Sequence, residues 1–153
     1  MKINPLGVCV VLMAFLCSCT MLKQDGQGVK GQVTWLEGNQ MPKVTEQAEQ
    51  SVNPKGTPVK RVILIYPLTK LQDSKMENGL FQSLATEPIT QVETDDNGAF
   101  SIELAPGSYS IFTKENEGIF ANSFDADGNI QPITIKNGEW QVLDIVINYR
   151  ATF

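Results

Sequence analysis

The feature of this sequence that most constrains its fold is a two-residue period of apolar side chains near its C-terminal end. Apolar residues occupy every second position in the run Leu143, Ile145, Ile147 and Tyr149. Successive side chains of a β-strand point to opposite faces of the sheet, so this period predicts a strand with one face in a core. Residues 29–35 have the same period. Both ends of the domain are therefore expected to be strands.

Five more segments have apolar or alternating patterns typical of strands: residues 59–66, 89–94, 99–104, 109–114 and 130–136. The strand predicted over residues 140–149 closes the sheet. The first of the five, VKRVILIY, has a continuous apolar centre, which predicts a strand covered on both faces. Residues 71–84 carry apolar positions at a loosely helical spacing, which predicts a turn of helix in a crossover loop.

Turn-forming sequences separate these segments. Asn97-Gly98 and Asn137-Gly138 favour the positive φ angles of tight hairpins, and residues 105–108, APGS, fit a type II turn. Strands at this even spacing predict an all-β sandwich. Residues 37–58 are rich in Gln, Asn, Pro, Lys and Gly and are expected to form a long loop.

The N-terminal segment has the pattern of an export leader. Lys2 is followed by an apolar run over residues 8–16, which is shorter than the roughly 20 residues of a transmembrane helix. Residues 16–19, LCSC, resemble the bacterial lipobox, in which the last cysteine is acylated, so Cys19 is expected to carry lipid. Cys17 fits less well, because Leu16 would then occupy a position that requires a small residue. The alternative is a plain secretory leader that is cut elsewhere.

The lipobox divides the chain into three segments. We expect residues 1–18 to be a removed leader, 19–28 a flexible tether and 29–153 a single β domain. All cysteines lie in the leader or at the lipid site, so the domain is expected to lack a disulfide. The expected location is the cell envelope, and Thr20, by resemblance to enteric lipoproteins, favours the outer membrane.

Composition narrows the functions that this chain can have. Its formal net charge is −5 and it has no cluster of Lys or Arg, so we expect no nucleic-acid partner. It contains no histidine, which removes the commonest general base and the usual zinc ligand. We therefore expect no cofactor and no enzymatic activity.

Three short motifs resemble the signature of carboxypeptidase regulatory-like domains. They are Gly31-x-Val33, Thr94-Asp95-x-x-Gly98-x-Phe100 and Leu104-x-Pro106-Gly107-x-Tyr109. The resemblance covers roughly residues 29–149 and implies a transthyretin-like Greek-key sandwich of about seven strands. Such domains are usually non-catalytic modules, and the resemblance implies no shared ligand.

Transthyretin-like hydroxyisourate hydrolases share that fold, which leaves a hydrolase as one alternative. The pair Tyr149-Arg150 resembles the start of their C-terminal Tyr-Arg-Gly-Ser sequence. Ala151 and Thr152 follow here instead, and the histidines on which those enzymes depend have no counterpart.

A possible metal site lies between two predicted strands. Asp125, Asp127 and Asn129 place oxygen ligands at alternate positions, as in half of a calcium loop. The twelfth position of such a loop requires a bidentate carboxylate, but Thr134 occupies it. A structural turn is the alternative for this Asp-Gly sequence, so no metal is assigned.

Aromatic residues supply the remaining ligand candidates. Trp35 and Trp140 fall in strand patterns, where aromatic rings mostly fill the core. Phe120 and Phe124 lie beside a predicted loop and are the candidates for a surface that stacks on a ligand. Residues 114–117, KENE, are expected to form a solvated turn.

The sequence thus predicts a lipid-anchored, non-catalytic envelope module with a binding or assembly role. Its expected partners are the membrane, reached through the lipid on Cys19, and another envelope protein. One alternative is a carbohydrate- or calcium-binding accessory of a nutrient-uptake system, motivated by the acidic and aromatic residues 118–129.

Overall fold

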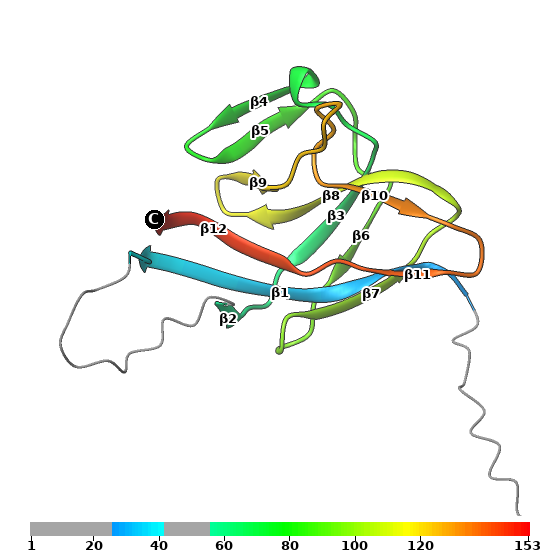
Figure 1. Cartoon of the computed structure of the whole chain (residues 1–153), viewed down its shortest axis with the longest axis horizontal. Helices are drawn as coiled ribbons and strands as arrows, with labels where there is room; N and C mark the ends of the chain where they lie inside the picture. The colour runs from blue at the N-terminus through cyan, green and yellow to red at the C-terminus, as the bar shows by residue number, and fades with distance from the viewer. Residues whose placement is uncertain (1–25, 42–55) are drawn as a thin grey trace, which may run out of the picture.

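Two β-sheets pack face to face in the computed structural model, which describes residues 26–41 and 56–153 (Figure 1). Side chains from both sheets meet in one apolar core, which includes Val33, Ile63, Ile111 and Ile147. The prediction of an all-β sandwich is confirmed. The described residues contain twelve strand segments, more than the seven or so expected. Several of these segments are only two or three residues long.

The smaller sheet is organised around its longest strand, β1 (Gly28–Asn39). Its other strands all pair with β1: β2 (Thr57–Pro58) and β7 (Ala99–Glu103) are antiparallel to it, whereas β11 (Trp140–Val142) and β12 (Ile145–Thr152) are parallel. The N-terminal half of β1 lies between β7 and β11, and part of its C-terminal half lies between β2 and β12. The first and last long strands of the domain are therefore direct neighbours.

A break between β11 and β12 divides the single strand that was predicted over residues 140–149. The backbone N–H of Leu143 donates to the carbonyl of Lys30, and the N–H of Gln32 donates to the side chain of Asp144. Gly31 lies between these two bonds, and a Cβ there would overlap the carbonyl oxygen of Leu143. The close approach of the two backbones therefore requires glycine.

The larger sheet has seven strands, all antiparallel to their neighbours. Their order across the sheet is β4 (Ser74–Glu77), β5 (Leu80–Leu84), β9 (Gly118–Phe120), β8 (Gly107–Glu115), β3 (Val62–Pro67) and β6 (Thr90–Glu93), with β10 (Pro132–Ile135) paired to β8. A 3-10 helix, η1 (Leu71–Asp73), precedes β4.

Strand β3 is buried on both faces, as its continuous apolar sequence predicted. Ile63 and Ile65 belong to the core between the sheets. Leu64 and Tyr66 point to the other face, into a second apolar cluster whose further buried members are Phe81, Phe112, Ala121 and Ile130. The larger sheet is therefore covered on its outer face by its own hairpin and loops.

The helical turn that was predicted within residues 71–84 is confined to η1, and the rest of this segment is a β-hairpin. Asn78 and Gly79 both have positive φ, 52° and 79°, and connect β4 to β5. Two consecutive positive φ angles are what a two-residue hairpin turn requires. The Asn-Gly pair determined the local structure, and the loosely helical spacing did not.

The two other Asn-Gly turns were wrongly predicted to be hairpins. Gly98 and Gly138 have φ of 73° and 70°, as tight turns require. However, the strands that each turn joins lie in different sheets, so the turns carry the chain across the sandwich. Gly107 has an extended φ of 159° and begins β8, so residues 105–108 do not form the expected type II turn.

Several predictions concern residues that lie outside the described part of the chain. These are the leader, Cys19, most of the tether, and residues 42–55 of the long loop. The described ends of that loop form the last residues of β1 and the strand β2. Among the described residues, no helix is long and apolar enough to span a membrane.

Candidate functional site

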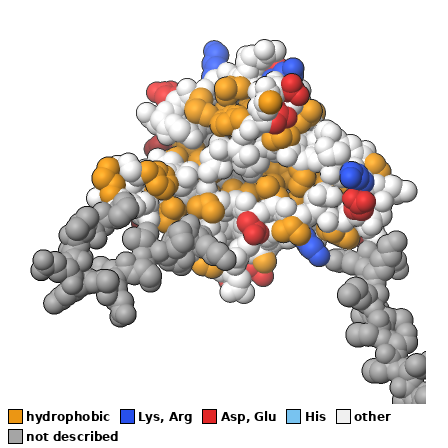
Figure 2. Space-filling view, viewed as in Figure 1, with side chains coloured by type: hydrophobic (Ala, Val, Ile, Leu, Met, Phe, Trp, Pro, Cys, Tyr) orange, Lys and Arg blue, Asp and Glu red, His pale blue; other side chains and the backbone are white. Residues whose placement is uncertain are grey.

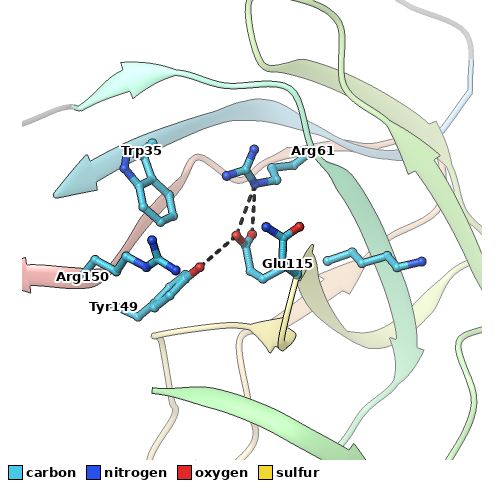
Figure 3. Close-up of a pocket in the computed structure, with 7 residues that line it drawn as sticks. Trp35, Arg61, Glu115, Tyr149 and Arg150 are labelled. Carbon is cyan, nitrogen blue, oxygen red and sulfur yellow. Dashed lines mark hydrogen bonds and ion pairs between the residues drawn. The ribbon is translucent and has the colours of Figure 1, made fainter. Parts of the chain in front are cut away.

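A hollow opens at one end of the sandwich, beside the C-terminal half of β1 (Figure 3). Its volume is about 230 Å³. The lining side chains come from β1, β8 and β12, from the residue before β3, and from the turn after β8; they are Trp35, Arg61, Lys114, Glu115, Asn116, Tyr149 and Arg150. We refer to this hollow as the Glu115 pocket.

The strand periodicity explains why these side chains meet. Each of four lining residues lies two positions from a buried residue of the same strand or its extension. The pairs are Trp35 with Val33, Arg61 with Ile63, Glu115 with Thr113 and Tyr149 with Ile147. Residues two apart share a face of a strand, so the pocket continues the inward faces of four segments past the end of the apolar core.

Glu115 is held at the base of the pocket, and its side chain is only 3% exposed. Arg61 Nε lies 3.2 Å and 3.3 Å from its two carboxylate oxygens. Thr113 Oγ1 donates to Oε1 at 3.0 Å, and the hydroxyl of Tyr149 donates to Oε2 at 3.4 Å. A buried carboxylate is tolerated only when it is paired and hydrogen-bonded, and these contacts meet that condition.

Tyr149 is perturbed by the same surroundings. Burial raises the pKa of its phenol, and the nearby Glu115 carboxylate raises that pKa further. The protonated hydroxyl is thus the favoured form, which is the form that can donate to Glu115.

Two aromatic rings form walls of the pocket, and each has a cation near it. The rings of Trp35 and Tyr149 meet edge to face, with centroids 5.3 Å apart. The guanidinium carbon of Arg61 lies 5.5 Å from the centre of the Trp35 ring, and that of Arg150 lies 5.7 Å from the Tyr149 ring. These distances are within cation–π range.

The charge of the pocket is opposite to that of the whole chain. The chain has a net charge of −5. The pocket lining contains Arg61, Lys114 and Arg150 but only one acid, Glu115. Arg61 is paired with Glu115, whereas Lys114 and Arg150 form no ion pair within the described residues. The pocket therefore has the electrostatic character of an anion site.

A second, larger hollow adjoins the Glu115 pocket. It has a volume of about 490 Å³ and shares Arg61, Lys114, Glu115 and Asn116 with the pocket. Its own lining adds Val62 and the exposed ion pair between Lys60 and Glu93, whose charged atoms are 3.2 Å apart.

The proposed calcium ligands lie elsewhere, in the loop before β10. Oδ1 of Asp125 accepts hydrogen bonds from the backbone N–H groups of Asp127 and Asn129, and Oδ2 accepts one from the Asn129 amide. The bond from the Asn129 side chain is the main reason that the pKa of Asp125 is lowered. These contacts fit the structural-turn alternative. Within the described residues, no three His, Cys, Asp or Glu side chains are grouped to hold a metal.

The two phenylalanines proposed as ligand candidates have different environments. Phe120 ends β9, is 2% exposed and packs against Tyr149, so the expectation that it lies on the surface is wrong. Phe124 is 45% exposed. Figure 2 shows apolar side chains gathered towards the end of the molecule that carries β4 and β5, and exposed apolar residues of this region include Leu71 and Met76.

The sequence interpretation missed the pocket because it assigned residues 114–117 to a solvated turn. Glu115 is buried, so that prediction is wrong for this residue. The signal was present, since the alternation along β8 places Glu115 on the same face as Ile111 and Thr113. Trp140 is half-buried with Lys30 near its ring and does not belong to the core cluster, whereas Trp35 both packs on the core and lines the pocket.

Comparisons of the chain with protein-family models, with curated proteins and with solved structures find no match. The resemblance to carboxypeptidase regulatory-like domains therefore stays a prediction from three motifs. Any function must be argued from the Glu115 pocket and from the N-terminal sequence.

Proposed function

We propose that this chain is a lipid-anchored, non-catalytic binding module of the bacterial cell envelope and that its ligand occupies the Glu115 pocket. One observation carries the proposal: a hollow at the open end of the core, with a buried carboxylate at its base, is lined by two aromatic rings and by two cations that form no ion pair within the described residues. Concave sites with a few convergent polar groups are the usual places for ligands.

The hydrogen bonding within the pocket favours binding over catalysis. Both oxygens of Glu115 already accept hydrogen bonds, and the hydroxyl of Tyr149 is one of the donors. A general base needs a free lone pair directed at the proton that it removes. Glu115 instead holds the side chains of Arg61 and Tyr149 in position through these hydrogen bonds. Within the described residues, the lining groups left to meet a ligand are the cations Lys114 and Arg150, the amide of Asn116 and Nη2 of Arg61.

The N-terminal sequence supports the anchor. Residues 8–16 are apolar, and residues 16–19 match the lipobox pattern that ends at Cys19. Fully extended, residues 19–28 span at most about 30–35 Å. An acylated Cys19 would therefore keep the start of β1 within that distance of the membrane surface.

The anchor is tested by labelling cells that express the full-length chain with a palmitate analogue, followed by membrane fractionation. We expect labelled protein in the membrane fraction for the wild type and for Cys17→Ala. Cys19→Ala should lose the label and leave that fraction. Retention of the label by Cys19→Ala would contradict the anchor.

The binding role is tested by hydrogen–deuterium exchange on the full chain in detergent micelles. Four probes cover different chemistries: maltotriose, trigalacturonic acid, trialanine and inorganic phosphate. We expect at least one probe to slow exchange in residues 113–116 and 147–150 but not in residues 123–130, and Arg150→Ala to remove that effect. Absence of protection by all four probes would overturn the assignment of the pocket as a binding site.

A further inference from the structure

The two adjoining hollows form one elongated, positively charged site. Arg150 lines only the Glu115 pocket, Lys60 lines only the second hollow, and Arg61 and Lys114 line both. The cations are therefore distributed along the whole length of the site. A single small anion would contact only part of this arrangement.

The arginines in this site have donors available to a ligand. Arg61 uses Nε for Glu115 and Nη1 for the carbonyl of Lys60, which leaves Nη2 without a hydrogen bond in the part of the chain that the structure describes. Arg150 is exposed, and within the described residues it contacts the Tyr149 ring while its guanidinium N–H groups form no hydrogen bond. A guanidinium presents its donors in a planar fork that matches a carboxylate.

The acids in the site argue against a densely charged ligand. Glu93 and Glu115 also line the site, where each is paired with one of its cations, Lys60 and Arg61. Nucleic acids carry about one negative charge per 1.7 Å of duplex axis, so these carboxylates would repel them. A glycan with one carboxylate on each sugar has wider charge spacing, and its hydroxyl groups can donate to Glu93 and to the Asn116 carbonyl oxygen.

The aromatic walls fit the same ligand class. Trp35 and Tyr149 lie at the Arg150 end of the site. Arg61 and Arg150 lie over these two rings, so a sugar ring that contacts the aromatic surface also lies beside both guanidinium groups. A flat bilayer offers no group of this shape to a recessed site.

We propose that the site binds an acidic oligosaccharide, a linear glycan with carboxylates on successive sugars, lying across both hollows from Arg150 to Lys60. This inference rests on the proposed function, because it names the ligand class of the same pocket. One carboxylate meets Arg150 and Arg61, and a neighbouring one meets Lys114 and Lys60.

The test is isothermal titration of the full chain in detergent micelles with trigalacturonic acid and with its fully methyl-esterified form. We expect binding of the acid and at least about tenfold weaker binding of the ester, because esterification removes the charge-assisted hydrogen bonds. Arg150→Ala and Lys60→Ala should each weaken binding of the acid by about five- to tenfold. Both side chains are exposed, so neither change should unfold the domain.

Lys136→Ala is the matched control, since Lys136 is an exposed lysine after β10 that lines neither hollow. It makes the same charge change and should alter the affinity by less than about twofold. The inference is overturned if Lys136→Ala weakens binding as much as Lys60→Ala, or if the ester binds as tightly as the acid. It is also overturned if only phosphate or phosphatidylglycerol vesicles bind. Should trigalacturonic acid fail while another probe protects residues 113–116, the ligand class falls and the binding module stands.

Discussion

The middle of the sandwich interior and its open end are built by the same strands but have opposite chemistry. Val33, Ile63 and Ile147 are completely buried and apolar. Two residues away on the same faces, towards the open end, lie Trp35, Arg61 and Tyr149, which surround a charged carboxylate. The alternation along a strand therefore determines which side chains point inward, but it does not determine whether those side chains are apolar or charged. The core supplies stability, and the end of the core is where charged groups can be held in fixed geometry at a tolerable cost.

From this comparison we expect the largest loss of folding stability for a substitution in the apolar core. Ile63→Ala removes a side chain with no exposed surface and should lower the free energy of unfolding by about 2–5 kcal/mol, because a cavity remains. Urea denaturation of the full chain, followed by tryptophan fluorescence, measures this loss. The exposed Ile89 offers a matched control, and Ile89→Ala should cost less than about 1 kcal/mol. Equal losses for the two variants would show that the apolar core is loosely packed.

A smaller effect is expected at the ion pair. Arg61→Ala leaves Glu115 buried without its cation, which should cost about 1–3 kcal/mol after discounting for the partial exposure of Arg61. Glu115→Gln keeps the shape of the side chain, and in this background Arg61→Ala should cost clearly less. The same denaturation measurement on the two single variants and the double variant gives the coupling. Additive losses would mean that the pair is not coupled.

The smallest expected effect is a shift in the titration of the Tyr149 phenol, which is measured by absorbance at high pH. Burial and the charge of Glu115 raise the pKa of Tyr149, so the neutral phenol is favoured in the folded state. Its contribution to stability is fully present below the unfolded pKa of about 10 and is lost as pH rises through the higher folded value. The tyrosinate absorbance of the wild type minus that of Tyr149→Phe isolates this titration. Glu115→Gln should move its midpoint to lower pH, and an unchanged midpoint would exclude an influence of Glu115 on Tyr149.

The strands could be predicted from the sequence more readily than their partners. The period of two located the buried residues at both ends of the domain, and the apolar centre of β3 predicted its double coverage. The pairing of β1 with β12 joins segments more than a hundred residues apart. Local turn chemistry does not encode such partners, which is why Asn97-Gly98 fitted a hairpin and yet links two sheets.

The site was harder to predict than the fold because its central residue breaks a compositional rule. Glutamate is rarely buried unless it is paired, and the partner Arg61 precedes Glu115 by 54 positions. The sequence alone shows neither the ion pair between Arg61 and Glu115 nor the burial of the Glu115 carboxylate that this pair makes tolerable. Phe120 was misplaced for a related reason: the short strand β9 that buries it leaves almost no periodic signal.

The direction of β1 has a mechanical consequence. The strand begins at Gly28, at the end of the segment proposed as a tether, and reaches the pocket at Trp35, roughly 23 Å further along at the usual rise of an extended strand. If the proposed anchor and the proposed ligand are both in place, a pull between them would run along β1. Ladder hydrogen bonds lie perpendicular to the strands in the antiparallel pair with β7 and obliquely across them in the parallel pairs with β11 and β12. A force along β1 would therefore load these bonds together in shear, and they would share it instead of opening one after another.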